Sequence, residues 1–313
     1  MVDVRPLLLA VDIGGTKLAA GLVSSAGVLM ETVSCPTPAG TDAETLFGVL
    51  VGLVDEVRND AFDRLVEIDD SLGRPEVCGV GVGGPMGSQG EWVSPLNITA
   101  WRRFPLRQRL ADHLGLPIYV DNDAKALALG EAWVGAASET ENFIAMVVST
   151  GVGGGIVLDG RLLDGTTGNA GHIGHVIVEP DGHECVCGSR GCLEAEASGT
   201  AIAKITGAPA AGADLAVKQR TGHMVGRGVS SVANLLDLQL AVVAGSVALG
   251  YGEAFFAAAQ AEIDARSTIL HGRGTVIRPA GLGAEGPLVG AAAVGRRGQG
   301  YAVGSVAALE GEQ

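Results

Sequence analysis

The sequence is poor in aromatic residues, which make up 4% of its 313 positions. Hydrophobic residues nevertheless make up 47% and charged residues 18%, a balance that excludes a wholly disordered chain. We therefore expect a core built from Ala, Val and Leu. Because domains usually hold roughly 100–200 residues, a chain of this length is expected to form two.

Basic residues are also in short supply. Lys and Arg number 21 against 35 for Asp and Glu, a formal net charge of −14. A surface of that sign repels phosphate backbones and anionic lipids, so DNA, RNA and membranes are not expected partners. A small anionic ligand remains compatible with the sequence if backbone N–H groups and a metal ion hold it.

Long hydrophobic runs are missing as well. The apolar run near the start ends at Asp12 and is too short for a secretory signal. The longest uncharged apolar stretch, residues 238–252, contains three glycines and falls short of the ~20 residues that a membrane span requires. We therefore expect a cytoplasmic protein. Three of its five cysteines lie within eight positions, which favours metal binding over disulfides in a reducing compartment.

Short apolar runs separated by tight turns occur in the same order twice. The expected strands are 7–11, 18–23 and 28–33 in the first half and 143–148, 155–158 and 161–163 in the second. In both halves the first turn is rich in Gly and Thr. The likeness lies in the pattern and not in the letters, and it predicts two related α/β domains.

Further strands are expected at 77–82, 117–120 and 240–243, and helices after a Thr41/Glu44 capping box, at 106–114 and at 124–133. Residues 201–227 show no clear pattern. We place the N-terminal domain at 1–121 and the C-terminal domain at 122–297, with a helix at about 298–313 completing the first. No linker marks the boundary, so the two domains are expected to share an interface and a cleft.

The two Gly/Thr turns are candidate phosphate sites. In the first, Gly14 and Gly15 let the backbone approach a phosphate, Thr16 and Lys17 can donate to its oxygens, and Asp12 can hold Mg²⁺. An ordinary hairpin turn is the alternative. The second turn holds the same place in the second repeat, and it comprises Thr150, Gly151, Gly153 and Gly154. Two such turns facing across a cleft would clamp a polyphosphate.

A polar pair, Asn122 and Asp123, ends one expected strand and opens a helix. Either residue can simply cap that helix. The functional alternative is a general base beside a hydrogen-bonding amide at the cleft. The local sequence leaves both interpretations open.

A cluster of one imidazole and three thiolates is the most specific signal. Cys185, Cys187 and Cys192 with His175 make a tetrahedral Zn²⁺ set. His172 and His183 compete for the place of the nitrogen ligand. Four protein ligands close the coordination shell, so the zinc is expected to be structural. Glu194, two residues after the last cysteine, would be held rigidly by the cluster.

Together these motifs resemble the ROK family of sugar kinases, which have the two-domain actin/hexokinase-like fold. The family's phosphate turn matches residues 12–17, its strand-end Asn-Asp-Ala matches 122–124, and its second phosphate turn matches 150–155. Its G-H-x9-C-x-C-G-x-x-G-C-x-E cluster matches residues 174–194 in full. Its adenosine-side turn resembles residues 242–246, including Gly245, and its C-terminal helix resembles 288–292.

The resemblance implies roles for several residues. Asp123 would be the general base, and Asn122, His175 and Glu194 would contact the sugar, with His175 also binding zinc. Gly83 and Gly84 would lie beside the sugar. ATP and Mg²⁺ would be needed, and a homodimer or homotetramer is expected. Some family members are repressors with an N-terminal helix-turn-helix, for which the expected first strand at about Leu7 leaves no room.

Three departures from the family pattern bear on the substrate. The family's glucokinases carry Glu where this chain has His172, and Ala-Gly-His-Ile-Gly-His at 170–175 resembles bacterial N-acetylmannosamine kinases. Lys125 and Ser246 replace a common Asn and Gly. We therefore expect ATP-dependent phosphorylation of the 6-hydroxyl of an N-acyl- or amino-hexose such as N-acetylmannosamine. The alternatives are a glucokinase, a polyphosphate-dependent kinase and a non-catalytic sugar-sensing regulator.

Overall fold

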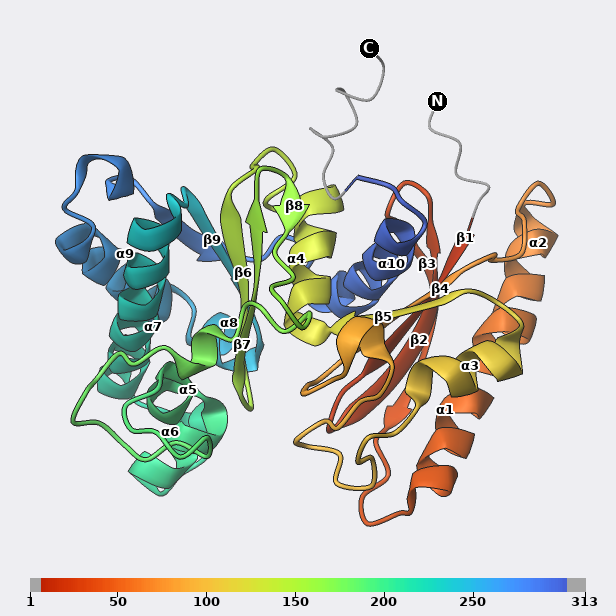
Figure 1. Cartoon of the computed structure of the whole chain (residues 1–313), viewed down its shortest axis with the longest axis horizontal. Coiled ribbons are helices and arrows are strands. Elements are labelled where there is room, and N and C mark those ends of the chain that lie inside the picture. The colour runs from red at the N-terminus through yellow and green to blue at the C-terminus, as the bar shows by residue number, and fades with distance from the viewer. Residues whose placement is uncertain (1–6, 303–313) are drawn as a thin grey trace.

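The computed structural model describes residues 7–302 and forms two lobes, each built on a five-stranded sheet (Figure 1). The first sheet has the order β3-β2-β1-β4-β5, with β1 (Leu7–Ile13), β2 (Lys17–Ser24), β3 (Leu29–Pro36), β4 (Cys78–Val82) and β5 (Ile118–Asn122). The second has the order β10-β9-β6-β7-β8, with β6 (Phe143–Val148), β7 (Val152–Leu158), β8 (Arg161–Leu162), β9 (Leu240–Ala244) and β10 (Val276–Pro279).

The two sheets share one topology. In each, the first three strands form an antiparallel meander, and the fourth and fifth strands run parallel to the first. This identity confirms the prediction of two related α/β units and of the fold class. It also places the turn after the first strand, and the end of the fourth, at equivalent positions in the two lobes.

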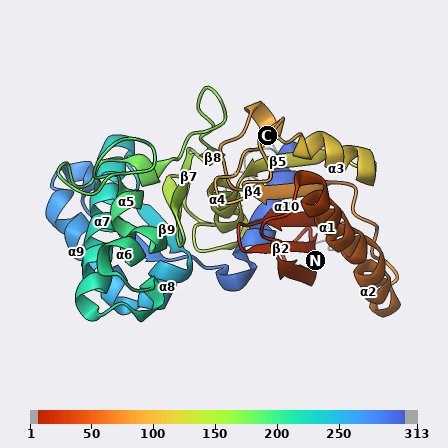
Figure 2. The same cartoon turned by 90° about the horizontal axis from the view of Figure 1, so that it is seen from below.

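Two helices, α4 (Asp123–Val134) and α10 (Gly286–Gly298), lie between the sheets (Figures 1 and 2). The first packs on β6 and β7 and the second on β1 and β4, and the two helices pack on each other. Most residues of both are buried, which explains why their sequences are largely apolar. A Cβ atom at Gly79 would lie 1.9 Å from the Ala291 carbonyl oxygen, so only glycine lets α10 approach β4 so closely.

The chain passes between the lobes twice, at the start of α4 and before α10. Glu131 of α4 is fully buried and joins the segment after α4 to the segment before α10. Its carboxylate accepts hydrogen bonds from the backbone N–H groups of Ala136 at 2.6 Å, Gly281 at 2.9 Å and Leu282 at 3.0 Å. Three N–H donors satisfy a carboxylate that would otherwise be costly to bury.

The remaining helices cover the outer faces of the two sheets (Figure 1). Those of the first lobe are α1 (Ala43–Glu56), α2 (Phe62–Ile68) and α3 (Leu106–Leu114); those of the second are α5 (Leu193–Ala197), α6 (Gly199–Thr206), α7 (Leu215–Leu236), α8 (Ser246–Tyr251) and α9 (Glu253–Arg266). A π-helical segment, η1 (Val57–Ala61), joins α1 to α2, and short 3-10 turns are η2 (Ser88–Gly90), η3 (Ile173–His175), η4 (Ala210–Gly212), η5 (Leu270–Gly272) and η6 (Gly283–Glu285). Within residues 7–302, none of the helices is long and apolar enough to cross a bilayer.

In three places the structure differs from the sequence-based expectations or adds to them. The cap of α1 is not a Thr41/Glu44 box: Asp42 accepts the Thr45 N–H at 2.8 Å. Residues 201–227, which show no clear pattern, form much of α6 and α7. The helix that packs on the first sheet is α10, at 286–298, and most of the segment expected to do so, 298–313, lies outside the described residues.

Candidate active site

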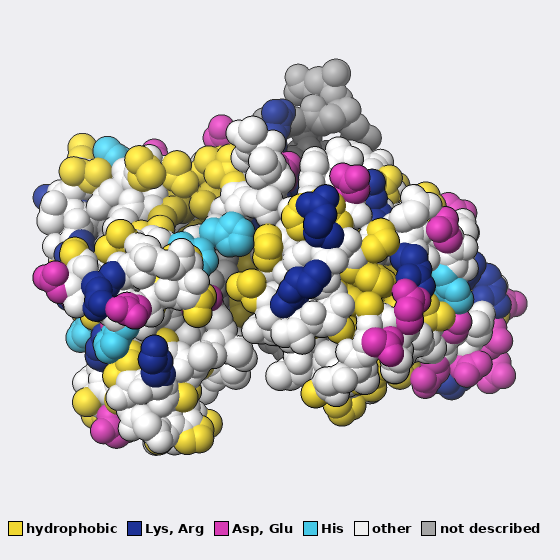
Figure 3. All heavy atoms as spheres, turned by 60° about the horizontal axis from the view of Figure 1, so that its bottom comes forward, with side chains coloured by type: hydrophobic (Ala, Val, Ile, Leu, Met, Phe, Trp, Pro, Cys, Tyr) yellow, Lys and Arg dark blue, Asp and Glu magenta, His cyan; other side chains and the backbone are white. Residues whose placement is uncertain are grey.

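A cleft of about 680 Å³ opens between the two lobes (Figure 3). Histidine side chains, cyan in Figure 3, lie at its edge. Many of the residues singled out in the sequence line it: Gly14, Gly15, Gly83, Gly84, Asn122, Asp123, Thr150, Gly151, Gly153, Gly154, His172, His175 and Glu194. Both lobes therefore contribute to one site, as expected from the missing linker.

The turn between β1 and β2 brings bare backbone to the cleft. It is closed by a hydrogen bond from the Gly14 N–H to the Lys17 carbonyl oxygen at 2.9 Å. A Cβ atom at Gly15 would lie 2.6 Å from the Asn97 Cβ, so a larger residue would displace that side chain. Thr16 and Lys17 are exposed on the same turn, outside the residues that line the cleft.

The equivalent turn between β6 and β7 faces the cleft from the second lobe. The Ser149 N–H donates to the Gly151 carbonyl oxygen at 2.9 Å, and the Thr200 hydroxyl donates to the Thr150 carbonyl oxygen at 2.9 Å. The N-terminus of α6 is thereby tied to the turn. The two glycine-rich turns therefore line the cleft from opposite lobes, and binding of a polyphosphate between them stays a prediction.

A second cavity of about 420 Å³ adjoins the cleft, since Ser149 and Thr150 line both. Gly245 lies beside this cavity, where β9 ends and α8 begins. Its φ of +103° suits glycine, and a Cβ atom there would lie 2.3 Å from the Val148 carbonyl oxygen. The next residue, Ser246, places its hydroxyl 2.9 Å from the Ser149 hydroxyl and lines the cavity.

The start of α4 carries the polar pair Asn122 and Asp123. Asn122 is the N-cap, and its side-chain oxygen accepts the Ala124 N–H at 3.0 Å. The Asp123 carboxylate accepts the same N–H through one oxygen at 2.8 Å. Asn122 and Asp123 therefore share one backbone donor at the start of α4, and both side chains also line the cleft.

Two carboxyl groups, that of Asp123 in the cleft lining and that of Asp12 on β1 outside the lining, have raised pKa values. The side chain of Asp123 is open to the cleft but recessed between the lobes, and this partial desolvation raises its pKa. Asp12, half-buried on β1, has its pKa raised to about 7, chiefly by burial and also by repulsion from Asp123, with Lys17 opposing the shift. Both carboxyl groups are therefore harder to ionise than an exposed aspartate.

His172 and Glu194 lie on the second-lobe wall. Burial, together with the nearby His175, lowers the pKa of His172, which favours its neutral imidazole. The rings of His172 and His175 have centroids 6.1 Å apart. One carboxylate oxygen of Glu194 accepts the Val152 N–H at 2.9 Å, which fixes Glu194 against the second glycine-rich turn.

The expected zinc ligands converge. The ligand atoms of His175, Cys185, Cys187 and Cys192 all lie within 4.8 Å of one another. The Sγ atom of Cys185 is 3.7 Å from the His175 Nδ1, and the Sγ atoms of Cys187 and Cys192 are 3.7 Å apart. A tetrahedron with metal–sulfur bonds of ~2.3 Å has edges of about 3.8 Å, so these spacings fit Zn²⁺.

The two competing histidines lie outside that cluster. The His183 ring nitrogen Nδ1 is 3.0 Å from a carboxylate oxygen of Glu196, and the His183 N–H donates to the same carboxylate. Glu196 is fully buried and also pairs with Arg220 of α7. His183 thus ties the cysteine-bearing loop to the helices behind it.

The sequence analysis missed several residues of the cleft. Asn97 and Asn169 line it from the first and second lobes, and Lys125 lines it although it was noted only as a departure from the family pattern. Lys125 is the one basic residue in an otherwise apolar and acidic helix, which is the signal that could have drawn attention to it. The asparagines lie in irregular segments with no comparable signal.

The paired sheets, the cleft between them and its two glycine-rich turns define a two-domain protein of the actin/hexokinase-like fold. Comparison with known families then gives a particular assignment. The chain belongs to the ROK family, whose model matches residues 8–297.

The relatives of this chain are named as kinases of two different sugars. An N-acetylmannosamine kinase of Citrobacter koseri is 36% identical over 259 residues, which cover 78% of this chain and 84% of that one. A glucokinase of Thermotoga maritima is 39% identical over 197 residues, 62% of this chain and 58% of that one. The crystal structure of a ROK family glucokinase from Streptomyces griseus with glucose and AMPPNP superposes with a TM-score of 0.73 at 30% identity, covering 93% of this chain and 99% of that one.

Proposed function

We propose that this protein transfers the γ-phosphoryl group of ATP to the 6-hydroxyl of an N-acyl- or amino-hexose, such as N-acetylmannosamine. The broader class, an ATP-dependent sugar kinase, rests on membership of the ROK family and on relatives that are sugar kinases. The observation that carries the proposal is the cleft itself. It brings the Asp123 carboxylate, the sugar-side residues and both glycine-rich turns into one space.

Asp123 is assigned the role of base. The 6-hydroxyl oxygen forms the new bond to the γ-phosphorus while the bond from that phosphorus to ADP breaks, and Asp123 receives the hydroxyl proton. Asn122, His175 and Glu194 would orient the sugar, and Gly83 and Gly84 would allow it close to the first lobe. Phosphoryl transfer depends mainly on positioning and electrostatics, so a carboxylate of modest basicity suffices.

The phosphates of ATP are assigned to the two turns. The N–H groups of Gly15 and Gly151 and the donors of Thr16, Lys17 and Thr150 would face them, and Gly14 would let the backbone come close. Mg²⁺, when bound, would neutralise part of the phosphate charge, and Asp12 is its proposed ligand, directly or through water. A recessed carboxylate beside a second one fits a hard cation. The adjoining cavity beside Gly245 would take the adenosine.

The substrate test is an ADP-release assay over a panel of hexoses and aminohexoses. We expect turnover with an N-acyl- or amino-hexose at a kcat/KM at least tenfold above that for glucose. If none of the sugars on the panel produces ADP release, although sugar binding is measurable, the protein would instead be a sugar sensor. The remaining alternative is a polyphosphate-dependent kinase. It is tested by offering inorganic polyphosphate in place of ATP and measuring sugar phosphorylation.

His172 is predicted to set the sugar preference. A neutral imidazole can donate to the carbonyl of an N-acyl group at C2, which the carboxylate of Glu would repel. An unpaired buried polar group costs ~1–3 kcal/mol, so His172→Glu is expected to move the kcat/KM ratio of N-acetylmannosamine to glucose about 10- to 100-fold towards glucose. An unchanged ratio would show that His172 only packs beside His175.

Proton uptake by Asp123 predicts a pH dependence. Because the base must be ionised and burial raises its pKa, kcat/KM for the sugar should fall as pH decreases, and should do so above the range of an ordinary aspartate. The profile is measured at saturating Mg²⁺ and ATP. A rate that stays constant down to about pH 5 would contradict the raised pKa.

Two further proposals concern the compartment in which the enzyme acts and its oligomeric state. We propose that it acts in the cytoplasm and forms a homodimer or homotetramer. Sedimentation equilibrium of the purified chain would test the second point, and a monomer at micromolar concentration would refute it.

A further inference from the structure

The loop between β8 and η3, residues 163–172, is a sugar-side wall without regular secondary structure. It places Asn169 and His172 in the cleft. Positive φ angles at Gly165, Gly168 and Gly171 show that the loop takes a path that depends on glycine. Such a segment needs contacts beyond its own backbone to hold two side chains in a fixed place.

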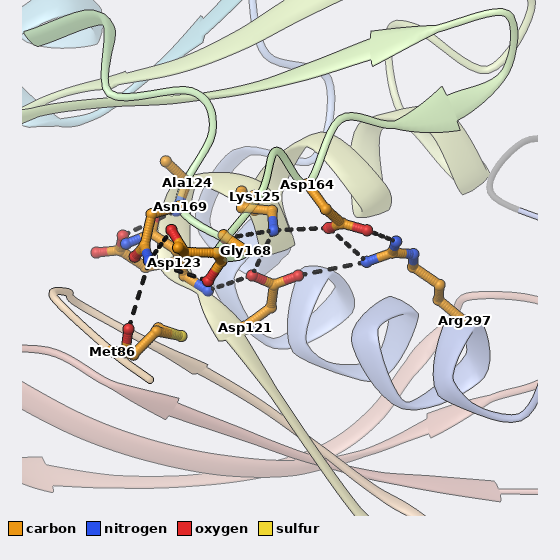
Figure 4. A network of polar contacts seen from close by, with 11 residues as sticks. Met86, Asp121, Asp123, Ala124, Lys125, Asp164, Gly168, Asn169 and Arg297 are labelled. Carbon is orange, nitrogen blue, oxygen red and sulfur yellow. Dashed lines mark hydrogen bonds and ion pairs between the residues drawn. The ribbon is translucent and has the colours of Figure 1, made fainter. Parts of the chain in front are cut away.

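Lys125 supplies those contacts at the base of the loop (Figure 4). Its side chain is 2% exposed, and its ammonium group donates to the Gly168 carbonyl oxygen at 2.9 Å. It also lies 2.9 Å from Asp164 and 3.0 Å from Asp121. A buried ammonium is tolerated only when such partners satisfy its donors. The loop is therefore bound to the first turn of α4, two residues after Asp123.

Asp164 is shared between Lys125 and a second cation. Arg297 of α10 donates to one Asp164 oxygen at 3.2 Å and also bonds the other, and it lies 3.5 Å from Asp121. Two carboxylates and two cations thus form a charge-balanced network, the Asp121–Lys125–Asp164–Arg297 network. It joins β5, α4 and α10 to the loop, as Figure 4 shows.

The far end of the loop reaches across the cleft. The Asn169 side-chain amide donates to the Met86 carbonyl oxygen of the first lobe at 3.4 Å and to Thr167 within the loop. The loop is held by the network at its base and by this contact near its tip, on either side of the space where the sugar is proposed to lie.

We infer that Lys125, Asp164 and Arg297 are positioning residues, whose network sets the place of Asn169 and His172 relative to Asp123. This inference rests on the proposed sugar kinase activity. Among the described residues, the network makes no hydrogen bond or ion pair to either glycine-rich turn, and the loop meets the second turn only where Gly171 packs on Gly154. We therefore expect the network to act on the sugar and to leave ATP binding unchanged. Misplacing a bound group by about 1 Å can cost ~10²-fold in rate.

The test is Asp164→Asn, which keeps the shape and removes the charge that Lys125 and Arg297 share. The Asp164 side chain is 44% exposed, so folding should tolerate the change. We expect kcat/KM for the accepted sugar to fall about 10- to 100-fold, with KM for ATP within twofold. Amide hydrogen exchange of residues 163–172 in the substrate-free protein should become faster, with other segments unchanged. Asp164→Glu, which keeps the charge, should restore most of the sugar kcat/KM.

Asp237→Asn is the matched control, because Asp237 is exposed, has a left-handed backbone that Asn accepts, and lies outside the cleft. Arg297→Gln serves as the second variant should Asp164→Asn not fold. A lower melting temperature with unchanged sugar kinetics, or unchanged exchange in the loop, would overturn the inference. If the parent phosphorylates no sugar, the proposed function fails, and the exchange experiment still decides whether the network anchors the loop.

Discussion

The Asp123→Asn variant is expected to keep its fold and its sugar affinity and to lose turnover by about 10²–10⁴-fold, the usual contribution of a positioned base. Asn retains the shape of the side chain but cannot take the hydroxyl proton. The helix should remain capped, because Asn122 accepts the Ala124 N–H independently. Turnover is measured by ADP release, sugar affinity by calorimetry and folding by thermal melting.

A matched control is available in the same chain. Asp214 is the N-cap of α7 and accepts the Val217 N–H at 2.9 Å, but it does not line the cleft. Asp214→Asn should leave turnover unchanged. If Asp123→Asn stays within about threefold of the parent, Asp123 is a helix-end residue and the assignment of the base is wrong.

Replacing Cys187 by Ser should remove metal and stability together. Thiolates and imidazole bind Zn²⁺ in closed structural sites, and in small zinc-binding peptides the binding free energy of ~10–16 kcal/mol contributes directly to folding. The parent is expected to carry about one zinc ion per chain by elemental analysis. The variant should carry less zinc and unfold at lower denaturant concentration.

Cys35→Ser provides the comparison, because Cys35 lies on β3, is half-buried and belongs to no metal cluster among the described residues. It should retain the zinc of the parent. A parent protein that is fully active and equally stable without metal would refute the structural role of zinc.

Local patterns were sufficient to predict the two meanders. The strands β1, β2 and β6 are each a short buried run between turn residues, so a few consecutive residues are enough to predict each strand. By contrast, β10 has four residues, of which only Ile277 is buried, and it ends in Pro279. Its place in the sheet depends on β9, and that dependence leaves no trace in its own sequence.

The candidate site likewise contains residues that local sequence motifs predicted and residues whose partners lie far away in the sequence. Sequence motifs pointed to the glycine-rich turns, Asp123 and the four expected zinc ligands, because each motif is short and chemically distinctive. The partners of Lys125 were not predicted, since Asp164 lies 39 positions away and Arg297 binds Asp164 from 133 positions away. A lone charged residue in a buried helix indicates that partners exist and does not say where they are in the chain.

The position of α10 has a consequence for synthesis of the protein. The inner face of the first sheet, with Leu8, Ala10 and Ala19, belongs to one apolar cluster with Leu288 and Ala291 of α10. A ribosome translates β5 roughly 10–30 s before α10, at ~5–20 residues per second. Throughout that interval the nascent first lobe must carry an uncovered apolar face. We expect the second lobe to reach its native state earlier, and chaperones to be needed mainly at the amino-terminal half.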